Sequence, residues 1–256
     1  MYKDLFQGLS WGIFRDIEDK VMASTQFVDL AGNNLKVFSR EFVNLLFQIC
    51  TNVEATFRGM LYSQSLAQSK KAQSARVKDL KAKEAKAKGQ RVNHLTIKDY
   101  REVFEDFYNL SSCEVIIAPR SIRLSRVPYQ EFSNKTSPVW WQVHNDVKHD
   151  LAGNFEKATL EIVLDSLAGL FLLNVVHLDA RNFLIENKVL KRFDAEYQVH
   201  PGTFKAEKLK EEFTNKQHFD INVLDCIVFA SKLFLFQPGK CGENWDQRNL
   251  YWFHYI

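Results

Sequence analysis

Residues 39–60 read SREFVNLLFQICTNVEATFRGM, and their pattern decides the fold class. Apolar side chains recur at intervals of three and four residues, which places them on one face of an α-helix. These residues are Phe42, Leu46, Ile49, Val53, Phe57 and Met60, and Leu45 and Cys50 widen the same face. Ser39 has the side chain of a good N-cap. The stretch therefore predicts a core helix of about six turns.

A second core helix is predicted at 155–178, which is apolar on most sides and follows Asn154 as a cap. Each of these two helices carries an apolar stripe too large to leave in water, so we expect 38–61 and 155–178 to pack together. Apolar spacing predicts three further helices, at 1–22, 98–110 and 221–236. Their inward residues include Trp11, Phe14, Ile17 and Val21 in the first, and Tyr100, Val103, Phe104, Phe107 and Leu110 in the second.

The composition also favours helices. A chain of 256 residues with 46% hydrophobic side chains can bury a full core without metals or disulfides. It has only ten glycines and five prolines, whereas an all-β sandwich needs turn residues every eight to twelve positions or so. We predict an all-α bundle with a small β-like excursion at 111–136. A short hairpin is also predicted at 27–37, turning at Gly32.

Three parts are expected along the chain. They are an N-terminal helix and hairpin (1–37), a helical bundle (38–180) and a C-terminal helical extension (181–256) that packs on the bundle. The extension holds a polar linker at 186–218. It ends in the aromatic sequence NLYWFHYI, which is expected to pack on the body or on a partner.

The sequence lacks the signals of export and of membrane insertion. Charged residues interrupt the N-terminal stretch, which excludes the apolar region of a signal peptide. Two apolar runs, 162–176 and 221–236, contain Asp165 and Asp225 and are interpreted as buried helices rather than membrane spans. The four cysteines form no CxxC pair, which favours a reducing, cytoplasmic compartment.

One segment supplies the basic charge of the chain. Residues 70–91 hold nine basic and two acidic side chains, a net charge of +7, while the whole chain carries +3. The Ala/Lys-rich stretch 64–88 predicts a helix that continues the 39–60 helix, projects into solvent and ends near Gly89. Such an arm is either a solvated extension or a nucleic-acid contact, in which case Lys78, Lys81 and Lys86 would meet phosphates.

The stretch 137–155, SPVWWQVHNDVKHDLAGNF, is the most informative for function. Ser137 as N-cap and Pro138 at the first helical position predict a helix start, and Gly153 predicts its stop. Helical spacing directs Trp140, Val143, Val147 and Leu151 inward, and it places Trp141, Asn145, Lys148 and His149 on a more exposed face.

This exposed face combines groups that suit RNA chemistry. An imidazole transfers protons near neutral pH, an asparagine holds a phosphate or ribose oxygen, and a lysine neutralises a phosphate. Together they would support cleavage of a phosphodiester through the ribose 2′-hydroxyl without a metal. The Trp141 ring would offer a surface on which a base stacks.

Three sequence features resemble bacterial HEPN-like proteins over roughly residues 38–178. They are a core helix with a mid-helix acid, Asn52-Val53-Glu54 before Phe57, then Pro138-x-Trp140-Trp141-x-x-x-Asn145-x-x-Lys148-His149, and then Asn154-Phe155 with Ala158 and Leu167-Ala168-x-Leu170. The resemblance implies a helical bundle that forms homodimers. Many members are metal-independent ribonucleases of toxin–antitoxin and anti-phage defence systems, so RNA and an antitoxin are implied partners.

The family motif is an arginine, a polar residue and a histidine on one helix. The resemblance assigns the polar residue to Asn145 and the histidine to His149, with Lys148 as a further catalytic cation. Its arginine position falls on His144, which carries no fixed charge and cannot form a bidentate fork. Trp141 and His144 would then contact substrate, and Glu54 would orient the His149 imidazole.

A second interpretation involves no catalysis. His149 would be a helix-end histidine near C-terminal carbonyls, His144 a core-edge residue, and Glu54 an exposed acid. The chain would then be a catalytically inactive HEPN-like module for interaction or nucleotide sensing. No Walker loop, GxGxxG, GxSxG or HExxH is present, and the seven histidines are scattered, so no metal or cofactor is expected.

Overall fold

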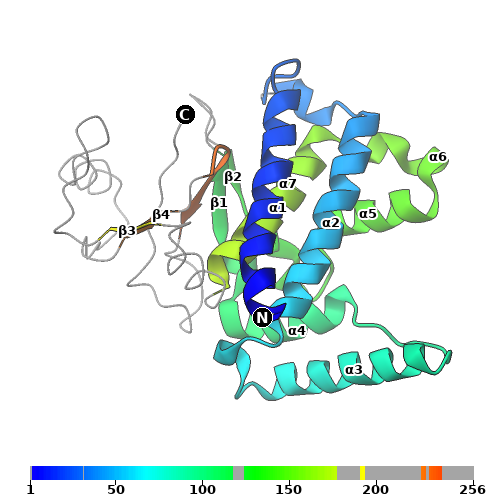
Figure 1. Cartoon of the computed structure of the whole chain (residues 1–256). Helices are drawn as coiled ribbons and strands as arrows, with labels where there is room; N and C mark the ends of the chain where they lie inside the picture. Colours follow the sequence, from blue (N-terminus) through cyan, green and yellow to red (C-terminus); the bar gives the residue numbers. More distant parts are fainter. Residues whose placement is uncertain are drawn as a thin grey trace.

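The computed structural model describes residues 2–30, 32–117, 124–177, 191–193, 226–228 and 231–237. Its α-helices are α1 (Tyr2–Ser24), α2 (Arg40–Met60), α3 (Lys70–Ala87), α4 (Ile97–Tyr108), α5 (Val139–His149), α6 (Leu151–Asn154) and α7 (Leu160–Val176). Its strands are β1 (Glu114–Ile117), β2 (Leu124–Arg126), β3 (Lys191–Phe193), β4 (Cys226–Val228) and β5 (Phe234–Gln237). The fold is therefore all-α with a small β excursion, as predicted (Figure 1).

The core lies between α2 and α7, as the sequence predicts. Ser39 caps α2, and its Oγ accepts a hydrogen bond from the Phe42 backbone N–H at 3.1 Å. All eight apolar residues of the predicted stripe are buried. α2 packs against α7, and α1 packs against both helices with Trp11, Phe14, Ile17 and Val21 buried.

The helix α7 begins five residues later than predicted. Thr159 has extended backbone angles and caps the helix through a hydrogen bond from the Ile162 N–H, while Phe155–Lys157 forms a separate 3₁₀ turn. The backbone of Phe38 forms a β-bridge to Thr159. This bridge ties the residues before α2 to the start of α7, so the segment preceding Leu160 stays non-helical.

The predicted hairpin at 27–37 is wrong. Residues Gly32–Lys36 form a 3₁₀ helix that begins at Gly32 with φ +53°. The Val37 carbonyl then accepts a hydrogen bond from the Leu160 N–H at 2.9 Å. Gly-Asn-Asn suits a left-handed start of a turn as well as a hairpin, and no strand flanks it.

The basic helix α3 is neither continuous with α2 nor projecting, contrary to the prediction. A turn and a short 3₁₀ helix (Gln64–Leu66) change the direction of the chain after Met60. Ser69 then caps α3 through a hydrogen bond from the Ala72 N–H. α3 then packs along α4. Its buried face consists of Ala72, Ala75, Asp79 and Ala82. Alanines and one acid do not register as an apolar stripe, which explains the error. The predicted end near Gly89 is confirmed, because Gly89 follows the helix with φ +66°.

A small antiparallel sheet replaces part of the predicted 221–236 helix. Strand β1 lies between β2 and β5, with Val115 opposite both Arg126 and Phe236. β3 and β4 form a second antiparallel pair. The stretch 221–236 is long enough for a helix, but short apolar runs within it fit strands equally well, and β1 presents an edge with which β5 pairs. The excursion predicted at 111–136 contains β1 and β2, so it is confirmed.

A buried carboxylate anchors the segment before β5 to α1. Glu18 is fully buried and accepts hydrogen bonds from the Ser231 hydroxyl at 2.5 Å and from the backbone N–H groups of Lys232 and Leu233 at 2.9 and 3.0 Å. Phe234 stacks on Phe171, with ring centroids 5.4 Å apart. The rest of the predicted C-terminal extension, including 186–218 apart from β3 and the aromatic tail, lies outside the described residues.

Two of the four cysteines, Cys50 and Cys113, differ in their bonding. Cys50 is buried and free, whereas Cys113 is disulfide-bonded. Among the described residues, none of the helices is long and apolar enough to cross a membrane.

Candidate functional site on α5

Helix α5 begins one residue later than predicted and is shorter. Pro138 is its N-cap, and the Pro138 carbonyl accepts hydrogen bonds from the Trp141 and Gln142 N–H groups. The helix ends at His149 because Asp150 leaves the helical region and caps α6, with its Oδ1 3.0 Å from the Gly153 nitrogen. Gly153 is therefore inside α6 and is not the stop that the sequence predicts.

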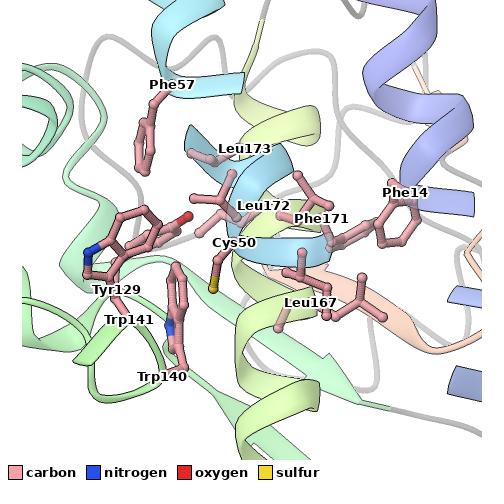
Figure 2. Packing of buried hydrophobic residues seen from close by; sticks show 14 of the residues in the cluster. Phe14, Cys50, Phe57, Tyr129, Trp140, Trp141, Leu167, Phe171, Leu172 and Leu173 are labelled. Atoms are coloured by element: carbon pink, nitrogen blue, oxygen red, sulfur yellow. The ribbon is translucent and has the colours of Figure 1, made fainter. Parts of the chain in front are cut away.

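The inward face of α5 is held by a tight aromatic contact. Trp140 is buried, and its indole Nε1 donates a hydrogen bond to the Pro128 carbonyl at 2.7 Å. A Cβ at Gly169 of α7 would lie 3.2 Å from Trp140 and from the Tyr129 hydroxyl, so a larger residue there would require these rings to shift by a few tenths of an ångström. Figure 2 shows Trp140 and Tyr129 directed toward the core beside Cys50. Val143 and Val147 are also buried, as predicted.

Two residues of the predicted helix have the opposite exposure from the one predicted. Trp141 is buried, with its ring centroid 5.9 Å from that of Trp140, so it is not an exposed platform for a base. Leu151, expected inside, is 51% exposed. α5 packs on both α2 and α7, so two of its faces are covered where one was expected.

His144 occupies a buried aromatic niche. Only 8% of the residue is exposed, and its ring lies 5.6 Å from the Phe47 ring and 5.5 Å from the Trp141 ring. Its Nδ1 is buried and has no hydrogen-bond partner among the described residues. Burial, together with the nearby charges of Lys148 and His149, lowers the pKa of His144 to about 4. The ring is therefore neutral at pH 7.

The remaining motif residues stay accessible at the C-terminal end of α5. Lys148 and His149 are exposed and Asn145 is half-buried, so all three share the solvent side of the last helical turns. Asp146 on the same helix is engaged by Lys157 at 2.7 Å. The structure thus gathers Asn145, Lys148 and His149, and it separates them from Trp141 and His144.

Glu54 contacts a different group of residues from the one expected. Its carboxylate pairs with Arg58 at 2.9 Å, and Arg58 in turn approaches the buried Asp79 of α3 at 3.5 Å. Asp79 also accepts a hydrogen bond from the Tyr62 hydroxyl at 2.7 Å. Within the described residues, Glu54 therefore takes part in the attachment of α3 and forms no hydrogen bond or ion pair with His149.

The three basic residues proposed for the α3 arm have different environments. Lys78 pairs with Asp99 at 2.8 Å, which holds α3 on α4. Lys81 and Lys86 are exposed and form no ion pair within the described part of the chain. Only Lys81 and Lys86 are therefore available to a phosphate.

Sequence reasoning missed an ion cluster between β2 and α7. Arg126 contacts Glu161 at 2.9 Å and Asp165 at 3.4 Å. Burial raises the pKa of Asp165 to about 6, although Arg126 opposes this shift. The available signal was the position of Asp165 inside an apolar run, since an acid there needs a partner.

The described residues contain no group of three or more His, Cys, Asp or Glu side chains that could hold a metal ion. Comparison of the chain with protein-family models, with curated proteins and with solved structures found no match.

Proposed function

We propose that this chain is a HEPN-like helical module that binds RNA at the exposed end of α5 and does not cleave it. The observation that carries the proposal is the burial of His144, the residue at the position of the family's arginine. A neutral imidazole between two aromatic rings cannot stabilise the charge that develops on a phosphate during cleavage.

The accessible groups suit binding. The Lys148 ammonium supplies a cation, and the Asn145 amide supplies hydrogen-bond donors one helical turn from His149. All three belong to one surface, so they can contact the same stretch of RNA backbone.

RNA binding can be tested by fluorescence anisotropy with a labelled RNA pool. Removing Lys148 and His149 together, as Lys148→Ala/His149→Ala, should raise the Kd about tenfold at low salt, because a cation and a hydrogen-bonding ring leave the site. Lys98→Ala removes one exposed lysine from α4, which Figure 1 shows away from α5, and is the charge-matched control, with a Kd close to wild type. Equal Kd values for the double variant and the control would contradict the proposal.

A second candidate is the metal-independent ribonuclease of a defence or toxin system. The specific observation in its favour is that Asn145 and His149 stay accessible one helical turn apart. In that case two copies of α5 would face each other in a homodimer and form one site. Cleavage of RNA in EDTA that disappears in His149→Ala would favour this candidate over the non-cleaving one.

A further inference from the structure

The outward face of α3 carries apolar side chains that no described element covers. Val77 and Leu80 are 51% and 50% exposed, although both lie in the middle of the helix. The opposite face, with Ala75 and Asp79, is buried against the bundle. Figure 1 shows α3 along the outer edge of the molecule, beneath α4. This exposed surface therefore belongs to a helix that is firmly held on its other side.

The exposed residues follow the spacing of a coiled-coil interface. Intervals of four and three residues alternate along the outward face, which is the a/d pattern of a heptad repeat. The positions in this seam are Gln73, Val77, Leu80, Glu84 and Ala87, all of them exposed. Only two are large and apolar, so a partner would also depend on the charges beside the seam.

The charges that flank the seam are positive on both sides. Lys81 and Lys88 occupy e positions and form no ion pair within the described residues. Arg76 and Lys83 occupy g positions on the other side. Arg76 donates hydrogen bonds to the carbonyls of Leu61 and Leu66, which precede α3, and Lys83 pairs with Asp79. A second copy of α3 would bring like charges together, which disfavours self-pairing.

A polynucleotide fits this face less well than a helix does. Phosphate contacts to Lys81 and Lys88 would leave Val77 and Leu80 in water and would bring Glu84 close to the anionic backbone. An acidic helix satisfies the lysines and covers the apolar pair at the same time.

We propose that α3 is the docking face for an amphipathic helix of another protein. That helix has apolar residues at its a and d positions and glutamate or aspartate at e and g. Glu84 requires a polar or basic residue opposite it, which would set the register. The surface is pre-formed, because the Lys78–Asp99 pair and the buried Asp79 hold α3 in place. The inference concerns a different surface from the RNA proposal for α5.

The test uses the full chain and a labelled three-heptad peptide with leucine at a and d and glutamate at e and g. The acidic peptide should bind, and Val77→Ser/Leu80→Ser should raise its Kd about tenfold because both large apolar contacts are lost. Lys81→Glu/Lys88→Glu should weaken binding by a similar factor. Val139→Ser is the matched control, since Val139 is also 51% exposed but lies on α5.

Three further probes test other possible occupants of the α3 face. They are the same peptide with lysine at e and g, a labelled RNA, and phosphatidylserine vesicles. The proposal is overturned if wild type does not bind the acidic peptide, if the basic peptide binds equally well, or if the Val77/Leu80 variant keeps the wild-type Kd. It is also overturned if RNA or vesicles bind while the acidic peptide does not, and if Val77→Ser/Leu80→Ser weakens that binding. The Lys148→Ala/His149→Ala variant should keep the peptide Kd, so failure of the RNA proposal is distinguishable.

Discussion

At the scale of single residues, the environment of His144 decides the chemistry that α5 can perform. Its ring contacts Phe47 and Trp141, and protonation would place a charge among apolar groups near Lys148 and His149. His144 is thus a neutral packing residue, and under the proposed function the position of the family's arginine carries no fixed charge. Asn145, Lys148 and His149 would then hold an anion without that charge.

His144 should make stability depend on pH. The pKa is about 4 in the folded protein against an ordinary value of 6.5, so the unfolded chain takes up this proton first as the pH falls. Its contribution is neutral above about pH 6.5 and becomes destabilising toward pH 4, by on the order of 2 kcal/mol. His144→Leu should lack this loss. Chemical denaturation of both proteins at pH 7 and at pH 4.5 measures it.

The contributions of other titrating groups to the pH dependence of stability cancel when wild type is compared with His144→Leu. Asp165 has a raised pKa of about 6, so its linkage has the opposite sign, and it is present in both proteins. An equal loss of unfolding free energy between the two pH values in wild type and His144→Leu would show that His144 is not buried as described.

The burial of His144 could not be predicted from the sequence. A helical wheel separates one apolar face from the rest, and it directs Trp140, Val143 and Val147 inward correctly. It cannot show that α2 and α7 both pack on α5 and cover Trp141 and His144 as well. The accessible trio Asn145, Lys148 and His149 was predicted because these residues lie at the polar end of the helix.

At the scale of the elements, α2 and α7 provide most of the core. Long periodic stretches predict such helices well, because few other structures bury that spacing. Short segments do not carry the same information. The 3₁₀ helix at Gly32–Lys36 and strand β5 depend on partners distant in sequence, Leu160 and β1, that local pattern cannot supply.

Truncation in this core should be costly. Ile49 and Phe171 are both fully buried, so Ile49→Ala and Phe171→Ala should each lose about 2–5 kcal/mol of unfolding free energy through lost transfer energy and an internal cavity. Urea denaturation measures both losses. Val139→Ala at an exposed position is the control and should change stability by less than about 0.5 kcal/mol. Losses below about 1 kcal/mol at both core sites would mean that α2 and α7 do not form the core.

The attachment of α3 should depend on Asp79. Asp79→Ala removes the acceptor of the Tyr62 hydroxyl and the partner of Lys83, so α3 should open locally at a cost of about 1–3 kcal/mol. Hydrogen exchange of the amides in α3 should accelerate, while that of α2 stays unchanged. Glu84→Ala, at an exposed position of the same helix, serves as the control. Uniform acceleration throughout the protein would instead indicate that α3 and the core unfold together.

The segment before β5 should depend on Glu18 in the same way. Glu18→Ala removes the carboxylate that accepts hydrogen bonds from the Ser231 hydroxyl and from the Lys232 and Leu233 N–H groups, and loss of this buried acceptor should cost about 1–3 kcal/mol. Limited proteolysis should then cut near Ser231 faster than in wild type. Asp16→Ala, two residues earlier on the exposed side of α1, should leave the cleavage rate unchanged. Slow cleavage in Glu18→Ala would show that other contacts hold the segment.

At the scale of the whole molecule, two surfaces with different chemistry lie on separate elements. The exposed end of α5 offers a cation, an amide and an imidazole, whereas the outward face of α3 offers an apolar seam between lysines. Figure 1 shows α3 along one edge and α5 beside α2, away from that edge. The two proposed ligands, RNA at α5 and a helical partner at α3, would therefore not compete for the same surface.

The most direct test of the central claim follows a labelled RNA pool incubated with the folded protein in EDTA, with binding and cleavage measured on the same samples. We expect wild type to bind the RNA and leave it uncut, and we expect His149→Ala to bind more weakly and also leave it uncut. Cleavage by wild type that His149→Ala abolishes would contradict the account and would identify a metal-independent ribonuclease.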